Sequence, residues 1–246
     1  MKKIAAKIHR SLAAIPGKNV PSVRLLRREW SKRLENLPGR SIIAVAKHLF
    51  PLGLWERGLA YEIIVHHRGA QEAIRPSDVA VLGRGIDSWG EVDSFACYVA
   101  GPAWRQKKLP DGVVRGWARS PNRWWRRAAL VSTVPLNNRA RGGIGDALRT
   151  LKICRMLVRD RDEMVVKALS WTLRELSKRD RLAVRLFLER YQGVLPARVS
   201  REVRNKLERG LKNPRHSRSP KRSDLPHGLE HASEGRRNVV EFDLDE

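Results

Sequence analysis

The sequence predicts an all-α protein, and three observations support this fold class. Apolar residues recur at intervals of three and four along most of the first 212 positions, which is the spacing of one buried helix face. No run combines strict apolar–polar alternation with hairpin turn residues, as antiparallel strands require. With 246 residues, 41% of them hydrophobic, the chain is long enough to bury a sizeable core.

Turn residues divide this pattern into segments, because glycine and proline interrupt regular helices. The main interruptions fall at 16–17, 38–39, 51–53, 84–85, 110–112, 142–143 and 195–196. Between them the periodicity predicts helices over 3–13, 21–37, 39–50, 54–68, 89–100, 123–133, 144–158, 163–178, 180–192 and 197–211.

A weak internal repeat connects several of these helices. The pattern Trp55–Leu59 resembles Trp125–Ala129 and Val165–Leu169, with a looser match at Glu91–Phe95. A repeat of this length is typical of stacked helix pairs of the HEAT kind, which curve into a solenoid. We therefore expect a HEAT-like helical repeat solenoid with a concave basic face. The polar positions of the four copies are Arg57, Asp93, Arg127 and Lys167, so Asp93 is the sole acid among them.

The net charge indicates a polyanionic partner. Lys and Arg number 50 against 26 Asp and Glu, a formal charge of +24. Residues 213–246 hold six basic and seven acidic side chains, which leaves 44 basic and 19 acidic side chains, or +25, on residues 1–212. Such a body repels itself unless a polyanion neutralises it. Nucleic acid is therefore the first candidate partner, and an acidic membrane surface is the second.

The composition changes near residue 213, where Pro, Ser, Arg and Glu replace most large apolar residues. We expect 213–246 to be a disordered mixed-charge tail, because it cannot bury enough apolar surface to order itself. Two arrangements stay open for its acidic end, 241–246. That end either folds back on the basic face or stays solvated, and the solvated arrangement is favoured.

Cysteine usage and hydropathy favour a soluble cytoplasmic protein, and a DNA partner would make it nucleoid-associated. Cys97 and Cys154 lie far apart without a CxxC motif, which argues against a disulfide framework and a zinc site. Basic residues at 7–10 interrupt any signal peptide, and no window approaches the roughly 20 apolar residues of a membrane span. His66 and His67 point in different directions on a helix, so we expect no metal.

The helix expected over 163–178 carries an indole on its basic side. Its apolar residues from Val165 to Leu176 form one stripe, which is the core face. Trp171 falls almost opposite that stripe, which favours a nucleic-acid contact over packing against a neighbouring repeat. The cations that share its side of the helix are Lys167, Arg174 and Lys178.

Three arginines gather near the start of the helix expected over 123–133. Arg123, Arg126 and Arg127 lie at i, i+3 and i+4 and therefore share a helix face. The free N–H groups of a helix N-terminus also attract anions, so phosphate binding is expected there. The alternative is a solvated charged face.

A tryptophan and an aspartate share one face of the helix expected over 89–100. Ser88 is a suitable N-cap with Glu91 at the capping-box position, so Trp89 and Asp93 lie one turn apart. An aromatic surface beside a negative charge suits a cationic ligand. The alternative is a structural Trp beside a solvated or salt-bridged Asp.

Four segments, in this order along the chain, carry a family resemblance. They are Gly17-x-x-x-Pro21-x-x-Arg24, Trp89-x-x-x-Asp93, Trp117-x-x-Ser120-x-Asn122-x-Trp124-x-x-Arg127-Ala128-Ala129, and Lys167–Glu175. Together they resemble the alkylpurine DNA glycosylases of the DNA alkylation repair type, which are built from HEAT-like repeats. The resemblance covers about residues 15–212.

The resemblance implies that residues 1–212 form a monofunctional glycosylase domain acting on double-stranded DNA. It implies hydrolysis of the N-glycosidic bond of cationic alkylated purines such as 3-methyladenine and 7-methylguanine. No deep base-flipping pocket and no metal or cofactor are implied, an abasic site is the product, and a monomer is the default. By position, Trp89, Asp93 and Trp171 would form the catalytic cleft, and Arg127, Arg174 and Lys178 would hold the DNA backbone.

The mechanism assigns a charge-stabilising role to Asp93. Cleavage of the bond to the sugar develops oxocarbenium character, which a nearby carboxylate stabilises, and the same carboxylate could position the attacking water. Two departures from the family pattern bear on rate and lesion preference. No aromatic residue stands near Ile8 or His9, and Gly90 favours a looser helix start.

Two alternatives remain open from the sequence. One is a non-catalytic HEAT-repeat protein that binds distorted or branched DNA through the same basic face. The other is a protein-binding helical scaffold, since many solenoids grip peptides.

Overall fold

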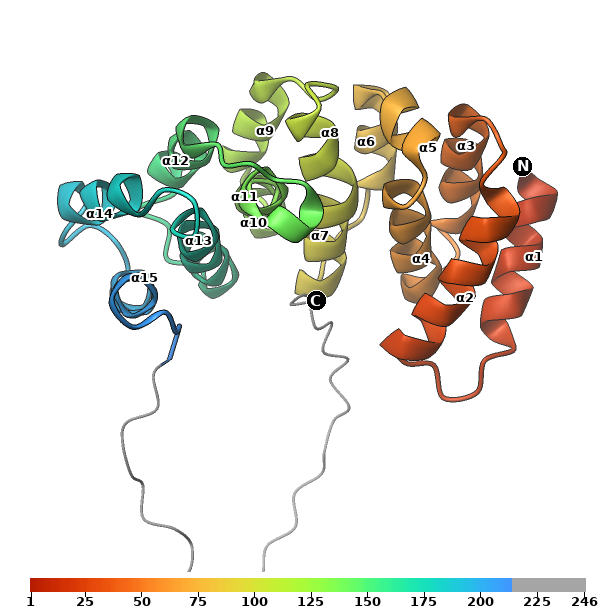
Figure 1. The fold of residues 1–246 in the computed structure, drawn as a ribbon, viewed down its shortest axis with the longest axis horizontal. Helices are drawn as coiled ribbons and strands as arrows, with labels where there is room; N and C mark the ends of the chain where they lie inside the picture. The colour runs from red at the N-terminus through yellow and green to blue at the C-terminus, as the bar shows by residue number, and fades with distance from the viewer. Residues whose placement is uncertain (214–246) are drawn as a thin grey trace, which may run out of the picture.

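The protein is an arch of α-helices, and the predicted all-α repeat fold is confirmed. The computed structural model describes residues 1–213, and no strand is present within them. Figure 1 shows the helices following one another along the arch from α1 to α15. Apart from Asn213, the tail expected over 213–246 lies outside the described residues. Within those residues, no helix has the length and apolar character needed to cross a bilayer.

The helices form two rows. The first row lies along the inner curve of the arch, and each member packs against the next (Figure 1). It contains α2 (Val20–Leu34), α4 (Leu54–Val65), α7 (Trp89–Phe95), α10 (Arg123–Val131), α13 (Glu163–Leu176) and α15 (Ala197–Arg209). The second row covers the outer curve with α1 (Lys2–Ala13), α3 (Gly39–Leu49), α5 (Arg68–Ala73), α6 (Pro76–Leu82), α9 (Asp111–Ala118), α12 (Ala147–Met156) and α14 (Arg181–Arg190).

Each of the ten helices predicted from periodicity is present, with ends that differ by a few residues. The sequence missed short elements that lie between prolines and glycines, because three to eight residues are too few for a periodic signal. These are α5, α6, α8 (Gly101–Arg105), α9, α11 (Val134–Asn137) and the 3₁₀ turn η2 (Arg139–Arg141). The helix expected from 144 begins only at Ala147, because Gly145 adopts a φ of 103°.

The helix that starts at Trp89 widens into a π-helix, η1 (Ala96–Ala100), before continuing as α8. Pro102 explains the widening, because it has no N–H and its ring would meet the carbonyl four residues earlier, on Tyr98. The Gly101 N–H instead donates to Ala96, five residues back. Tyr98 lies within this widened turn.

Ion pairs tie neighbouring repeats together. Arg57 on α4 binds Glu91 on α7 at 2.8 Å, and Arg126 on α10 binds Asp160, just before α13, at 2.7 Å. Since Arg57 occupies a position of the internal repeat, this part of the repeat has a structural role.

Gly39 is required where α3 meets α5. A Cβ at this position would lie 1.9 Å from the backbone oxygen of Gly69, which is far inside contact distance. We expect Gly39→Ala to lower the free energy of unfolding by about 3 kcal/mol, because the two backbones must separate. Gly58→Ala is the matched control, since no atom lies within 4 Å of its Cβ and alanine favours the interior of α4. Urea titration of both variants checks this, and equal midpoints would contradict it.

Candidate functional site

Asp93 is buried in an ion pair with Arg127, which joins α7 to α10. Arg127 Nε donates to Oδ1 of Asp93 at 2.8 Å, and Nη2 donates to Oδ2 at 2.6 Å. Asp93 is 3% exposed and Arg127 is 6% exposed. Burial raises the pKa of Asp93 above its ordinary value, and the adjacent guanidinium opposes that rise.

This geometry corrects two expectations. Arg127 does not share an exposed face with Arg123 and Arg126, because it turns inward and also donates to the Met164 carbonyl at 2.6 Å. Asp93 does not present an open carboxylate, because both of its oxygens are bound to Arg127. Asp93, the one acid among the four polar positions of the internal repeat, is therefore the counter-ion of Arg127 in the next repeat. The 34-residue spacing of these two positions did not reveal that they pair.

The most specific sequence motif builds the start of α10, which sets the position of Arg127. The Asn122 side chain accepts from the Trp124 N–H at 2.8 Å, and Ser120 Oγ accepts from the Asn122 N–H at 3.2 Å. Trp117 packs against Trp125 with ring centroids 5.1 Å apart. The motif therefore fixes the entry of a helix whose fifth residue is Arg127.

The two tryptophans of the predicted cleft lie on different helices. Trp89 opens α7 one turn before Asp93 and is half-buried, so the expected shared face exists. Trp171 is on α13, on the same face as Met164 two turns earlier, whose carbonyl binds Arg127. Trp171 is half-buried and packs against the core, so it is less exposed than the sequence suggested. Arg127 thus connects α7, α10 and α13, the three helices that carry the predicted cleft.

The other predicted DNA-contacting cations lie near the surface, and several pair with acids. Lys167 binds Glu163 at 2.9 Å, and Lys178 binds Glu175 at 2.9 Å. Arg174 is half-buried and lies within 3.3 Å of Ser170 Oγ. Arg123 lies 3.6 Å from Asp162, and Arg126 is held by Asp160. Their contact with DNA remains a prediction.

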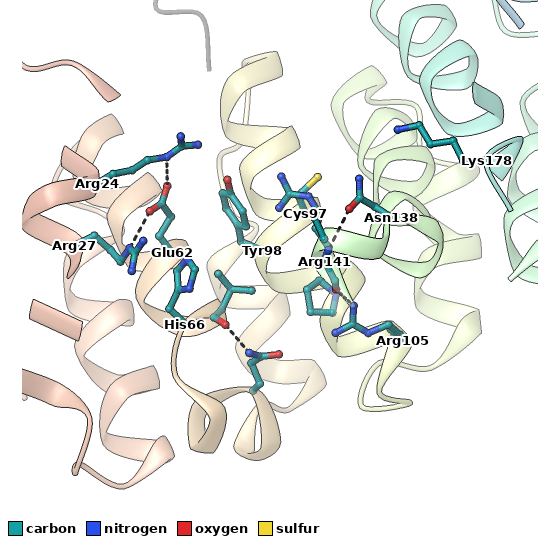
Figure 2. A pocket seen from close by; sticks show the side chains of 14 residues that line it. Arg24, Arg27, Glu62, His66, Cys97, Tyr98, Arg105, Asn138, Arg141 and Lys178 are labelled. Carbon is teal, nitrogen blue, oxygen red and sulfur yellow. Dashed lines mark hydrogen bonds and ion pairs between the residues drawn. The ribbon is translucent and has the colours of Figure 1, made fainter. Parts of the chain in front are cut away.

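A cavity of about 610 Å³ opens on the inner curve, between α2 and the end of α13 (Figure 2). We call it the arginine groove. Tyr98 stands at its centre, with the Arg141 guanidinium 4.9 Å from its ring centroid. Glu62 is the one acid among its lining residues and binds Arg27 at 3.3 Å. The cations of the lining are Arg24, Arg27, Arg105, Arg141 and Lys178.

The electrostatics of the arginine groove favour an anion. Burial and the charges of Arg27, Arg24 and Arg141 lower the pKa of His66 to about 4, so this lining histidine is neutral at pH 7. Arg105 donates to the carbonyls of Pro135 and Arg141, and burial lowers its pKa. Guanidinium groups arranged in this way match phosphate oxygens.

Cys97 connects the arginine groove to the ion pair. It lines the groove one turn after Asp93, and burial raises its pKa to about 12, so it is an inert thiol. Asp93, one half of the ion pair, lies one turn before Cys97, on α7, which continues into η1 where Cys97 lies. Trp89, Asp93 and Trp171 themselves lie outside the lining of this cavity.

The structure shows what stands at the two positions that depart from the family pattern, near Ile8 and His9 and at Gly90. Ile8 is fully buried in the core, and His9 Nδ1 lies 2.8 Å from Glu56 Oε1. Gly90 does not prevent the helix start, because α7 begins at Trp89 and the Ser88 side chain caps it by accepting from the Glu91 N–H. Within residues 1–213, no group of three His, Cys, Asp or Glu side chains could hold a metal ion.

Paired helices stacked into an arch, with a cationic groove on the inner curve, define a helical-repeat protein suited to a polyanion. The sequence model of a family described as "DNA alkylation repair enzyme" matches residues 2–207. The chain therefore belongs to the DNA alkylation repair enzyme family, which gives it a role in DNA repair.

Among solved structures, the fold is similar to that of a protein titled a predicted DNA alkylation repair enzyme from Enterococcus faecalis. The TM-score is 0.62 at 16% sequence identity, and the match covers 84% of this chain and 93% of that chain. No protein with a curated description matches.

Sequence reasoning missed the arginine groove. Arg105 and Arg141 lie outside every helix predicted from periodicity, and Tyr98 lies inside the helix predicted over 89–100 without any assigned role. Arg24 stood in a motif that carried the resemblance but had no assigned role. One sequence feature could have pointed to the groove. Gly101-Pro102 follows directly after the helix predicted over 89–100, and such a pair marks a local change of helical register.

Proposed function

We propose that this family member is a monofunctional DNA glycosylase that releases cationic alkylated purines, such as 3-methyladenine and 7-methylguanine, from duplex DNA. The observation that supports the proposal most directly is the Trp89–Asp93 pair on α7, whose carboxylate is held by two hydrogen bonds from Arg127. A carboxylate fixed in this way needs little reorganisation when positive charge develops beside it.

Asp93 would act on the sugar, whose bond to the cationic base breaks with oxocarbenium character. Arg127 reduces the net negative charge of Asp93, but each carboxylate oxygen retains a second lone pair. Because Asp93 is 3% exposed, DNA binding would have to uncover that lone pair before it could face the sugar or the attacking water. A low local dielectric strengthens that interaction. Trp89 and Trp171 would each stabilise a nearby cation by about 0.5–2 kcal/mol. The product is an abasic site.

The arginine groove would hold the DNA backbone beside this pair. Arg105 and Arg141 lie on the same wall as Cys97, one turn beyond Asp93, so a bound phosphate chain would pass close to the ion pair. Because the groove is open along the inner curve, the lesion need not enter a deep pocket. Phosphate contacts of this kind make affinity fall steeply with salt.

The proposal predicts base release from methylated duplex DNA. Purified protein incubated with such DNA should liberate 7-methylguanine or 3-methyladenine, measured by liquid chromatography of the ethanol-soluble fraction. The strand should stay intact until alkali cleaves the abasic site, because no lysine nucleophile is required. Unmethylated duplex is the control. Immediate strand nicking, or no free base above the control, would contradict the proposal.

One observation favours a second candidate, a non-catalytic repeat protein that binds distorted or branched DNA. Asp93 is almost fully buried and neutralised by Arg127, which is the geometry of a structural ion pair. Tight, salt-dependent binding to a branched duplex without base release would favour this candidate over the glycosylase.

A further inference from the structure

A groove on the outer curve of the arch has an apolar floor and a cationic rim. It lies between α12 and α14, has a volume of about 640 Å³, and shares no lining residue with the arginine groove. We call it the outer groove. Leu148 on α12 is 82% exposed and Leu186 on α14 is 54% exposed, and both line it. Its other apolar lining residues are Ala147, Leu151, Ala183, Phe187 and Tyr191.

The rim of the outer groove is positively charged and unneutralised. Lys152 and Arg155 on α12 and Arg190 on α14 line it, and no carboxylate does. All three are exposed, and within residues 1–213 none of them forms an ion pair. Nearby apolar exposure enlarges the patch, since Leu182 is 64% exposed and Ile144 90% exposed. Patches of this kind on a soluble protein mark binding sites.

The apolar lining and the cationic rim of the outer groove indicate which kind of ligand it can bind. The phosphate backbone of a nucleic acid gains no favourable contact from the apolar leucine side chains of this groove. A second copy of the chain in the same groove would bring two cationic rims together, and like charges repel. The groove instead fits a segment that alternates apolar and acidic residues.

The chain itself carries such a segment at its carboxyl end. Residues 239–246 read Val-Val-Glu-Phe-Asp-Leu-Asp-Glu, with four acidic and no basic side chains. In an extended backbone, alternate residues face opposite sides, so Val240, Phe242 and Leu244 would share one side and Glu241, Asp243 and Asp245 the other. We propose that residues 239–246, which lie outside the described part of the chain, bind in the outer groove.

The residues between Asn213 and Val239 are numerous enough for the segment to reach the outer groove. The segment begins 26 residues after Asn213, and 26 residues span at most about 90 Å. α15, which precedes Asn213, packs against α13 and α14, so the described chain ends in the part of the arch that carries α14 (Figure 1). A short tether of this kind gives an effective concentration in the millimolar range, so modest contacts suffice. This proposal is independent of the glycosylase activity.

Photo-crosslinking in the full chain tests the proposal. Phe242→p-benzoylphenylalanine should crosslink within one molecule to peptides of α12 and α14, identified by mass spectrometry after digestion. Leu229→p-benzoylphenylalanine is the control for a tail position outside the segment and should give at least about tenfold less of these products. Leu186→Glu in the groove should reduce the Phe242 products by a similar factor, because it adds a like charge and removes apolar contact. Since Leu186 is exposed, this variant should keep the wild-type melting temperature.

Three outcomes overturn the proposal. Crosslinks to residues of the arginine groove would place the acidic end on the inner curve instead. Crosslinks between two molecules, whose yield rises with protein concentration, would make the outer groove a contact between copies. The groove does not bind the segment if the crosslinks to α12 and α14 persist in Leu186→Glu. The same holds if the Phe242 variant with an unchanged groove forms no such crosslinks.

Discussion

Asp93→Asn should reduce release of 7-methylguanine from methylated duplex DNA by about 100-fold or more, while the Kd for the same duplex changes by less than about threefold. Removing one preorganised stabilising group commonly costs this much in rate. Asparagine keeps the size of the side chain but cannot supply negative charge to the breaking sugar bond. Single-turnover excision and fluorescence anisotropy at one fixed salt concentration measure the two effects separately.

The ion pair requires a matched control, because asparagine also leaves Arg127 buried without its counter-ion. Breaking a buried pair by removing one partner costs about 3–5 kcal/mol, so the single variant should melt at a lower temperature. The double variant Asp93→Asn/Arg127→Gln removes both charges and should recover much of that stability. Excision should stay low in the double variant. If excision returns together with stability, Asp93 is a structural residue and the catalytic assignment is wrong.

Asp78→Asn should lower the free energy of unfolding at pH 7 by about 2–4 kcal/mol, the largest effect we expect outside the cleft. Asp78 is fully buried and accepts hydrogen bonds from Arg40 and Lys47 on α3 and from the Arg75 N–H at the start of α6. Asparagine removes the charge that holds α3 to α6. Denaturant titration checks the value, and Glu72→Gln in the exposed Arg68–Glu72 pair is the control that should leave the midpoint unchanged.

The same residue gives a pH dependence. Burial alone would raise the pKa of Asp78, but the hydrogen bonds from Arg40, Lys47 and Arg75 hold it below its ordinary value. Its contribution is therefore complete above the unfolded-state pKa of about 4 and is lost as the pH falls through the lower folded-state pKa. The stability difference between wild type and Asp78→Asn should be constant from pH 5 to 8 and shrink below about pH 4. A difference that grows on acidification would contradict this.

The fold was predictable because helical periodicity is a local signal that the structure reproduces. The core stripe of α13 from Val165 to Leu176 spans about three turns, and the shared face of Trp89 and Asp93 spans about one, so both follow from residues close together in sequence. The partner of Asp93 was not predictable in the same way. Arg127 is 34 residues away, and its inward orientation depends on how α7 and α10 pack.

The arginine groove escaped prediction for a related reason. Its cations come from α2, α8, η2 and the residue that follows α13 by two positions, and only the curvature of the arch brings them together. Lys178 was expected to contact DNA, but each of the four arginines reads as an ordinary surface arginine in its own segment. Net charge predicted a polyanionic partner but not the place where it binds.

The ion pairs that join α4 to α7, α7 to α10, and α10 to the segment before α13 make the bending of the arch depend on charge as well as on packing. The cations that line the arginine groove are a different set from the arginines of these joints. A phosphate chain held by the groove would therefore leave the joints intact. The curvature of the arch should stay the same with and without a bound duplex.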